Sequence, residues 1–234
     1  MLREGSNSLL TSDHRYHYLE SLITLFVVIL LISNIVAAKF FALGPLRISA
    51  AQMLFPLTYI FGDIFTEVYG YSASRRAIWY GFFASFLLVA ITYIAVKIPG
   101  APEFRDQAAY ATIFLPVGRI VFASLIAYWF GEFANSFTLA KLKLVTNGKY
   151  LWTRTIGSTI VGQAVDTTLV ILIAFYGTRP PGVLFALIIS GYLSKVIYET
   201  VMTPVTYAVV GYLKRQEGVD YFDRGTDFNP FAAH

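Results

Sequence analysis

Long apolar stretches, each about as long as a membrane-spanning helix, recur along the whole chain. A bilayer core of about 30 Å requires about 20 apolar residues per helix, and lipid tolerates no unpaired backbone polar groups. No Pro/Gly/Ser-rich linker and no low-complexity tract separates the stretches. The sequence therefore predicts an all-α integral membrane protein, a single domain over residues 1–234, with six transmembrane helices at about 20–43, 48–70, 76–98, 117–140, 153–176 and 182–213.

The composition supports a membrane protein and argues against a water-soluble enzyme. Only 14% of the residues are charged and 56% are hydrophobic, whereas soluble domains carry about 25% charged residues. The chain has no cysteine, and its histidines, His14, His17 and His234, lie near the ends. It also lacks a phosphate-binding loop of the ATPase type. We therefore expect no metal, no cofactor, no catalytic residue and no ATP hydrolysis by this chain alone.

The basic residues indicate the orientation in the membrane, because cytoplasmic loops carry an excess of lysine and arginine. With the N-terminus inside, the outer segments hold only Arg47, Lys97, Arg105 and Arg179. The cytoplasmic segments hold Arg3, Arg15, Arg75, Arg76, Lys141, Lys143, Lys149, Arg154, Lys214, Arg215 and Arg224. Both termini are therefore expected in the cytoplasm. Basic residues placed around one rim serve insertion, so nucleic acid is not an expected partner.

Charged residues inside the expected spans are the main sign of function. Each costs at least about 2.5–3.5 kcal/mol at a helix centre, so they must face protein, water or one another. The amides Asn34, Gln52, Asn135 and Gln163 accompany them. The set predicts a polar cavity between helices, and its charged members are Lys39, Asp63, Glu67, Arg119, Glu132, Asp166, Lys195 and Glu199.

Several of these charges have a structural alternative. Lys39 and Arg119 lie near the outer ends of their spans, where long side chains can reach the interface. Lys195 and Glu199 are four residues apart and could form an ion pair within one helix. Asp166 has no basic neighbour on its own helix face, so another helix or a ligand must provide its partner.

Depth divides the polar residues into two groups. An outer group is expected to bind substrate, with Tyr59 as a stacking surface: Asn34, Lys39, Tyr59, Arg119, Gln163, Asp166, Lys195 and Glu199. An inner group could carry protons or gate the path, or could be paired permanently with lysine and arginine: Asp63, Glu67, Glu132 and Asn135. Pro56 and Gly62 lie within the second span and predict a kinked or broken helix there.

Specific motifs resemble the queuosine precursor transporter family, also known as a putative vitamin uptake transporter family. The most specific motif runs from Phe55 to Tyr71, and the run Asn34–Lys39 precedes it. Further matching positions are Arg75, Trp79–Gly81, Arg119, Ala123–Leu125, Lys141, Arg154, Ser158, Gly162, Gln163, Val165–Thr167, Lys195, Glu199 and Pro204. The resemblance covers about residues 20–213, and the two ends of the chain carry no part of it.

The resemblance implies an inner-membrane importer of 7-cyano-7-deazaguanine, 7-aminomethyl-7-deazaguanine and also queuine, used for tRNA modification. It also implies a six-helix arrangement similar to the substrate-binding subunits of energy-coupling-factor vitamin transporters. Two other functions stay open: a substrate-binding subunit that works with a separate ATP-driven module, and a membrane-embedded enzyme. Homo-oligomerisation stays open too, because an apolar helix face looks the same against lipid or a second subunit.

One residue leads to a sharper hypothesis. Asp166 lies near the middle of its span, and Gln163 lies one turn away on nearly the same face. We expect Asp166 to accept N–H donors from a flat heterocycle, while Gln163, Asn34 or a lysine binds its carbonyl oxygen.

Overall fold

The computed structural model describes residues 16–36, 39–43, 46–114 and 118–232. Its helices confirm the all-α membrane class; a short antiparallel hairpin, in which Phe40 pairs with Ser49, is the only sheet within those ranges. The helices are α1 (Leu19–Val36), α2 (Phe55–Ile64), α3 (Tyr71–Lys97), α4 (Gln107–Phe114), α5 (Gly118–Val145), α6 (Leu151–Phe175) and α7 (Pro181–Glu217). The hairpin strands are β1 (Phe40–Leu43) and β2 (Leu46–Ser49), followed by the 3₁₀ turn η1 (Ala50–Met53), and the π-helical turn η2 (Phe65–Tyr69) follows α2.

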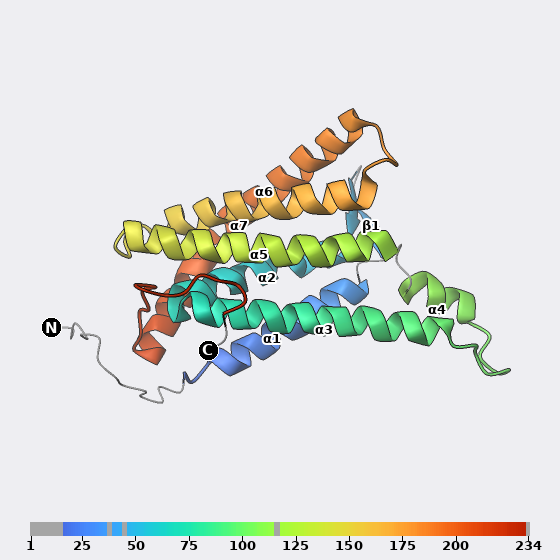
Figure 1. The fold of residues 1–234 in the computed structure, drawn as a ribbon, viewed down its shortest axis with the longest axis horizontal. Helices are drawn as coiled ribbons and strands as arrows, with labels where there is room; N and C mark the ends of the chain where they lie inside the picture. The colour runs from blue at the N-terminus through green and yellow to red at the C-terminus, as the bar shows by residue number, and fades with distance from the viewer. Residues whose placement is uncertain (1–15, 37–38, 44–45, 115–117, 233–234) are drawn as a thin grey trace.

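Within the described ranges, four helices are long and apolar enough to cross a membrane: α1, α3, α6 and α7. The expected count of six spans is therefore not confirmed. α2 has only ten residues, and α5, although 28 residues long, carries polar side chains such as Glu132 and Asn135 along its middle. Figure 1 nevertheless shows α5 running alongside α6 over most of its length.

The first two expected spans differ from the observed elements. α1 ends at Val36 instead of residue 43, because residues 40–43 form β1. The expected second span is broken, since β2, η1, α2 and η2 share it. Pro56 lies in the first turn of α2, where its missing N–H costs no helical hydrogen bond, so Pro56 itself does not kink the helix. The distortion comes later, in η2, and Gly70 then ends the segment with a positive φ of 86°.

Glycines bring α5 and α6 into close contact. A Cβ added at Gly131 would lie 2.7 Å from Cβ of Asp166, and a Cβ added at Gly162 would lie 2.7 Å from Cβ of Asn135. Small residues at such crossings allow two backbones to approach within van der Waals range in a membrane. The same crossing therefore places polar side chains of α5 and α6 beside each other.

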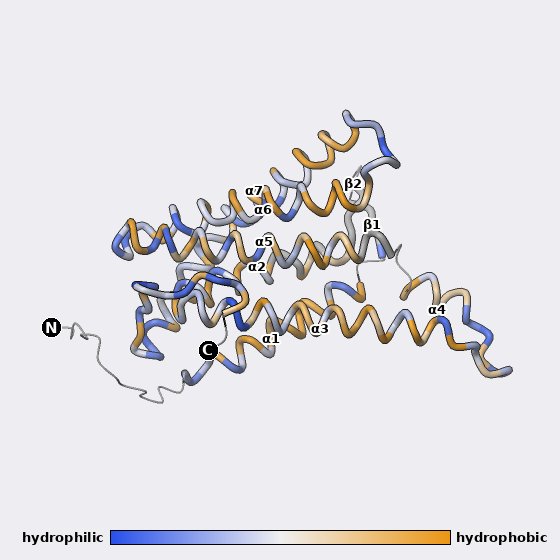
Figure 2. Tube along the Cα trace, in the orientation of Figure 1, coloured by the Kyte–Doolittle hydropathy of each residue, from blue (hydrophilic) through white to orange (hydrophobic). Residues whose placement is uncertain are grey.

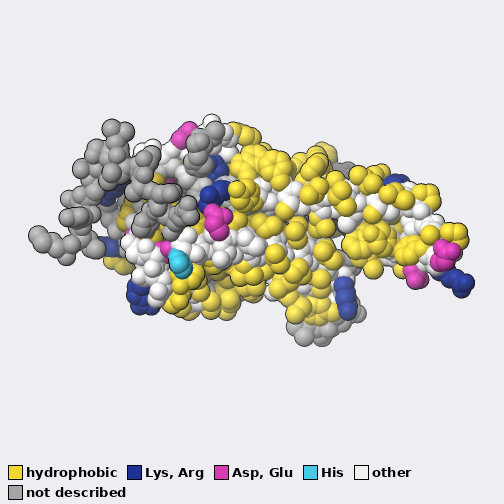
Figure 3. Space-filling model, turned by 90° about the horizontal axis from the view of Figure 1, so that it is seen from below, with side chains coloured by type: hydrophobic (Ala, Val, Ile, Leu, Met, Phe, Trp, Pro, Cys, Tyr) yellow, Lys and Arg dark blue, Asp and Glu magenta, His cyan; other side chains and the backbone are white. Residues whose placement is uncertain are grey.

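The outer surface of the bundle is apolar. Large side chains such as Phe86, Phe185 and Val201 are 56%, 67% and 69% exposed. Only 6% of the residues in the most apolar segment of α7 are buried. Hydrophobic residues occupy most of the length of the long helices in Figure 2. In Figure 3 the charged side chains gather toward the two ends of the molecule. A surface of this kind suits contact with lipid, so the chain is a multi-pass membrane protein.

The beginning of α1 and the end of α7 meet at one end of the bundle (Figure 1). The backbone N–H groups of His17 and Tyr18 donate to the Glu217 carboxylate at 2.9 and 2.8 Å, and the Tyr69 hydroxyl donates to it at 2.9 Å. The residues after α7 fold back over the same end, where Asp223 accepts the backbone N–H of Tyr71 at 3.1 Å.

Candidate functional site

Four helices contribute polar side chains to one region near the middle of the bundle, which we call the central cluster. Asp166 lies fifteen residues after the start of the 25-residue α6, and Glu132 lies near the middle of α5. Except for Lys195, whose side chain is 29% exposed, every member is buried. The central cluster consists of Tyr59 and Asp63 from α2, Glu132 and Asn135 from α5, Gln163 and Asp166 from α6, and Lys195 and Glu199 from α7.

An ion pair between α6 and α7 forms one half of the central cluster. Nζ of Lys195 binds Oδ2 of Asp166, so another helix supplies the partner that Asp166 lacks on its own face. The Tyr59 hydroxyl lies 3.4 Å from both Oδ2 of Asp166 and Nζ of Lys195, and Tyr59 also contacts Gln163. The Lys195 ammonium lies 5.7 Å from the centroid of the Tyr59 ring. This half therefore presents a cation, a carboxylate and an aromatic ring side by side.

The other half consists of carboxylates that form no ion pair among the described contacts. Asn135 donates to Oδ1 of Asp63 at 2.8 Å, and a Cβ added at Gly62 would lie 2.7 Å from Oε2 of Glu132. Glycine at position 62 therefore makes room for the Glu132 carboxylate against α2. Glu199 interacts electrostatically with both Asp63 and Glu132, which also interact with each other.

Acceptors outnumber donors in the central cluster. Among the described residues, several buried oxygens have no hydrogen-bond partner: Oδ2 of Asp63, both carboxylate oxygens of Glu132, Oε1 of Gln163 and Oε1 of Glu199. Four carboxylates, Asp63, Glu132, Asp166 and Glu199, face one ammonium group, that of Lys195. Such a set is suited to a ligand that carries N–H donors or positive charge.

Glu67 lies outside this cluster and is surrounded by cations. Arg154 binds both of its carboxylate oxygens, with Nη2 at 2.7 Å and Nε at 3.1 Å. Lys214 lies 2.6 Å and Lys143 3.6 Å from Oε1, and Lys143 also donates to the Glu67 backbone carbonyl at 2.6 Å. The completeness of this pairing favours the structural alternative for Glu67, that of a permanently paired carboxylate.

The structure does not bring all the expected substrate-binding residues together. The amide of Asn34 lies 3.4 Å from the Ser85 hydroxyl, between α1 and α3. Lys39 is exposed and lies in the segment between α1 and β1. Arg119 belongs to the first turn of α5, and its side chain lies outside the described residues, as does that of Gln52. The described contacts connect neither Asn34 nor Lys39 to the central cluster.

The expected division by depth also changes. Asp63, Glu132 and Asn135 were expected in an inner path, yet they lie beside Asp166, Lys195 and Glu199 in one cluster. These residues come together because the helices cross, and the position of a residue along its own span does not show where another helix crosses it. Likewise, Lys195 pairs across helices with Asp166, whereas one alternative was a pair with Glu199 inside α7.

Sequence reasoning overlooked the residues that anchor the C-terminal tail, residues 218–232. Lys143 is 1% exposed and binds Glu67, Asp220 and the backbone carbonyl of Tyr221. Burial raises the pKa of Asp220, but the hydrogen bonds and charges of Lys143 and Lys214 outweigh burial and leave this pKa below its ordinary value. The only sequence signal was the concentration of basic residues at this end.

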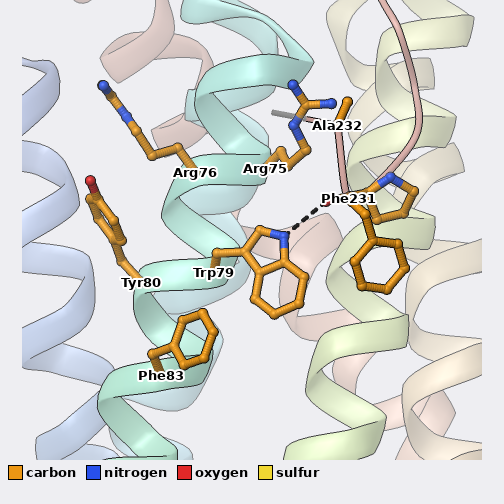
Figure 4. Close-up of a pocket in the computed structure, with 8 residues that line it drawn as sticks. Arg75, Arg76, Trp79, Tyr80, Phe83, Phe231 and Ala232 are labelled. Atoms are coloured by element: carbon orange, nitrogen blue, oxygen red, sulfur yellow. Dashed lines mark hydrogen bonds between the residues drawn. The ribbon is translucent and has the colours of Figure 1, made fainter. Parts of the chain in front are cut away.

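A cavity of about 340 Å³ lies between α3 and this tail (Figure 4), apart from the central cluster. The Trp79 indole donates to the Pro230 carbonyl at 2.9 Å, and Arg75 donates to the backbone carbonyls of Asp227 and Asn229. These contacts hold the tail against α3. The cavity is lined by Arg75, Arg76, Trp79, Tyr80, Phe83, Pro230, Phe231 and Ala232.

The described residues contain no group of three or more His, Cys, Asp and Glu side chains that could hold a metal ion. What the central cluster can do is bind. Its polar groups converge from different helices at mid-bundle, as in transporters.

Comparisons with known proteins agree with this geometry. The model of the family described as "putative vitamin uptake transporter" matches residues 49–209, which include every member of the central cluster. A protein of Bacillus subtilis (strain 168) named "probable queuosine precursor transporter" is 27% identical over 177 residues, covering 75% of this chain and 77% of that protein. No solved structure matches the chain.

The family match covers more than half of the chain, and the matched helices carry both the apolar surface and the buried polar cluster. The protein is a membrane transporter and not an enzyme, and it belongs to the family described as putative vitamin uptake transporter.

Proposed function

We propose that the protein imports queuosine precursors, 7-cyano- and 7-aminomethyl-7-deazaguanine, and also queuine, across the bacterial inner membrane. The name of the Bacillus subtilis relative supports this substrate class. The observation that carries the proposal is the central cluster, where buried acceptors lie beside an ammonium group and a tyrosine ring. A 7-deazaguanine is flat, presents N–H donors along one edge and has one carbonyl oxygen, so it matches these groups.

The proposed roles follow from the partners of each residue. Asp166 accepts N–H groups of the heterocycle through the oxygen that Lys195 does not bind, and Lys195 or the Gln163 amide binds the carbonyl oxygen. Tyr59 positions both members of the ion pair and presents its ring to the base. Asn34, Lys39 and Arg119 are proposed to act only along the route to this site.

We further propose that both termini face the cytoplasm. The end of the bundle where α1 begins and α7 ends also holds Lys149 in the loop between α5 and α6, Arg154 in the first turn of α6, and the tail contacts of Arg75. Cytoplasmic loops carry the excess of basic residues, so this end is placed inside.

Binding and transport test this function separately. The purified protein in detergent should gain thermal stability from deazaguanines and not from unrelated vitamins, because a ligand stabilises the folded state by RT ln(1 + [L]/Kd). Proteoliposomes that contain this chain alone should then accumulate the same compounds. Stabilisation by none of the deazaguanines would rule out the proposed substrate class.

A second function is favoured by the family description, which names vitamin uptake. In that case the chain is the substrate-binding subunit of an ATP-driven transporter. It would bind its ligand in detergent but show no uptake in proteoliposomes until an ATP-hydrolysing module is added. Uptake by the chain alone would exclude this second function.

A further inference from the structure

The central cluster carries more negative charge than its surroundings neutralise. Only Lys195 supplies a positive charge, and it binds Asp166. Glu67, one turn from Asp63 on the same segment, binds Arg154, Lys143 and Lys214, and these cations form no described ion pair with a carboxylate of the central cluster. The titratable groups that face the cluster are Tyr59 and Asp63 from α2, Glu67 from η2, Tyr128 and Glu132 from α5, Asp166 from α6, and Lys195 and Glu199 from α7.

No other carboxylate of this set has fewer hydrogen-bond partners than Glu132. Its side chain is 1% exposed, and neither of its oxygens has a hydrogen-bond partner among the described residues. A buried ionised carboxylate without a partner costs several kcal/mol, so such a group holds a proton unless a cation replaces it. Asp63 at least accepts a hydrogen bond from Asn135.

A neutral side chain independently indicates a ligand that donates hydrogen bonds. Gln163 is 2% exposed, and its carbonyl oxygen Oε1 has no partner among the described residues, although the same side chain contacts Tyr59 at the cluster. Buried amide oxygens are almost always paired in folded proteins, so an unpaired one beside a cluster of acids points to a donor that arrives with the ligand.

We propose that the central cluster exchanges a proton for the positive charge of its substrate, with Glu132 as the principal proton carrier. This inference rests on the proposed function. In the substrate-free state, a proton occupies Glu132. When a substrate with an ammonium group enters, the carboxylic acid of Glu132 releases its proton to water, and the resulting carboxylate accepts an N–H of the ammonium group. No bond of the substrate breaks, and the net charge of the cluster stays the same.

Two consequences distinguish a cationic from a neutral substrate. Binding of 7-aminomethyl-7-deazaguanine releases about one proton, so its affinity rises up to about tenfold per pH unit where Glu132 is protonated in the free protein and the ligand remains an ammonium ion. Binding of 7-cyano-7-deazaguanine, which is uncharged, releases none, and its affinity does not follow this pH dependence.

Titration calorimetry in two buffers of equal pH but different ionisation enthalpy tests the exchange. The difference in heat gives the number of protons released per ligand. We expect about one for the aminomethyl compound and about zero for the cyano compound. Equal proton counts for the two ligands, or a count of zero for the aminomethyl compound, would overturn the inference while leaving the proposed function intact. Binding of neither ligand would remove the proposed function, and this inference with it.

Substitution of Glu132 tests whether this side chain carries the exchanged proton. Glu132→Gln has the shape of the protonated acid, so the protein should fold, but it cannot release a proton or become an anion. It should bind the aminomethyl compound at least about tenfold more weakly without proton release, and lose much less affinity for the cyano compound. Glu20→Gln, at an exposed pair with Arg76, is the matched control. Equal weakening of both ligands would indicate a merely structural role for Glu132 and would overturn its assignment.

Discussion

Glu67 shows how one buried carboxylate can hold several segments together. It is fully buried in the π-helical turn η2 and binds Arg154 from α6 and Lys214 from α7. Lys143 from α5 reaches the same carboxylate and also Asp220 of the tail. Lipid tails are as apolar as the helix surfaces, so a buried ionic group of this kind fixes the positions of the helices relative to one another.

Substitution of Glu67 tests this role. Glu67→Gln leaves Arg154 buried without a counter-charge and leaves Lys143 with Asp220 alone, so we expect a loss of about 3–5 kcal/mol in the free energy of unfolding. Thermal or denaturant unfolding in detergent measures it. Glu20→Gln removes an exposed ion pair and should cost about 1 kcal/mol or less. Equal stability of the two variants would contradict the structural role of Glu67.

A substitution of Asp166 tests the proposed hydrogen bonds between its carboxylate and the heterocycle. Asp166→Asn keeps the size of the side chain but presents a donor where the ligand also has donors. The variant should fold, because Lys195 is partly exposed and keeps access to water, but it should lose ligand-induced thermal stabilisation and uptake. If Asp166→Asn binds and transports like the wild type, Asp166 does not accept the N–H groups of the ligand, and Glu199 becomes the expected acceptor.

At the scale of elements, the crossing of α5 and α6 decides where the polar groups meet. Gly131 packs against Asp166, and Gly162 packs against Asn135. Both contacts involve members of the central cluster, so a change in helix separation moves the site itself. Gly70 is similarly restricted, because it has positive φ and a Cβ there would lie 2.2 Å from the Tyr221 ring.

A larger residue at this crossing should damage the site. Gly131→Ala places a methyl group against Asp166 and should cost about 1–3 kcal/mol of stability and weaken ligand binding. Gly211→Ala in α7 meets nothing within 4 Å and serves as the matched control, with no loss expected. Thermal unfolding with and without ligand compares the two variants. Undiminished binding by Gly131→Ala would show that the crossing does not set the site geometry.

The contact between α1 and α7 should depend on pH through Glu217, which lies beyond the expected last span. Burial raises the pKa of Glu217, but the N–H groups of Tyr18 and His17 and the Tyr69 hydroxyl outweigh burial, so the pKa lies below its ordinary value. A lowered pKa in the folded state means that this stabilisation is present above pH 4.5, the ordinary value, and is lost as the pH falls through the folded value.

Amide hydrogen exchange at the start of α1 measures this contact. Protection of Tyr18 should decrease in acid for the wild type, and in Glu217→Gln it should be lower at neutral pH and insensitive to acid over the same range. Protection that does not change with pH in the wild type would contradict the role of this carboxylate.

At the scale of the whole molecule, the apolar surface and the two charged ends define a body that crosses a bilayer (Figure 3). The chain has no cysteine, so single introduced cysteines give an unambiguous labelling signal. Lys149→Cys, in the loop between α5 and α6, should react with a membrane-impermeant reagent only from the cytoplasmic side. Arg179→Cys, in the exposed loop between α6 and α7, should react only from the outside. The reverse pattern would invert the proposed orientation.

Much of this protein could be predicted from its sequence. Hydropathy depends on the order of residues alone, and it predicted the membrane class and the approximate positions of α3, α5, α6 and α7. The cost of charge in lipid selected Asp63, Glu132, Asp166, Lys195 and Glu199, which lie in the central cluster. It also selected Lys39 and Glu67, which lie outside the cluster. The motifs indicated the family that the comparison then showed.

The partners of these residues were decided by the tertiary structure. Helix register and crossing distance bring Lys195 to Asp166, Asn135 to Asp63 and Arg154 to Glu67, over separations of 29, 72 and 87 residues. Spacing along a chain determines only which residues share the face of one helix, whereas an ion pair between helices requires their relative rotation and depth. Likewise, the sequence indicated a kinked or broken helix around Pro56 and Gly62, but only the structure showed that α2 begins at Phe55, after η1 and the hairpin.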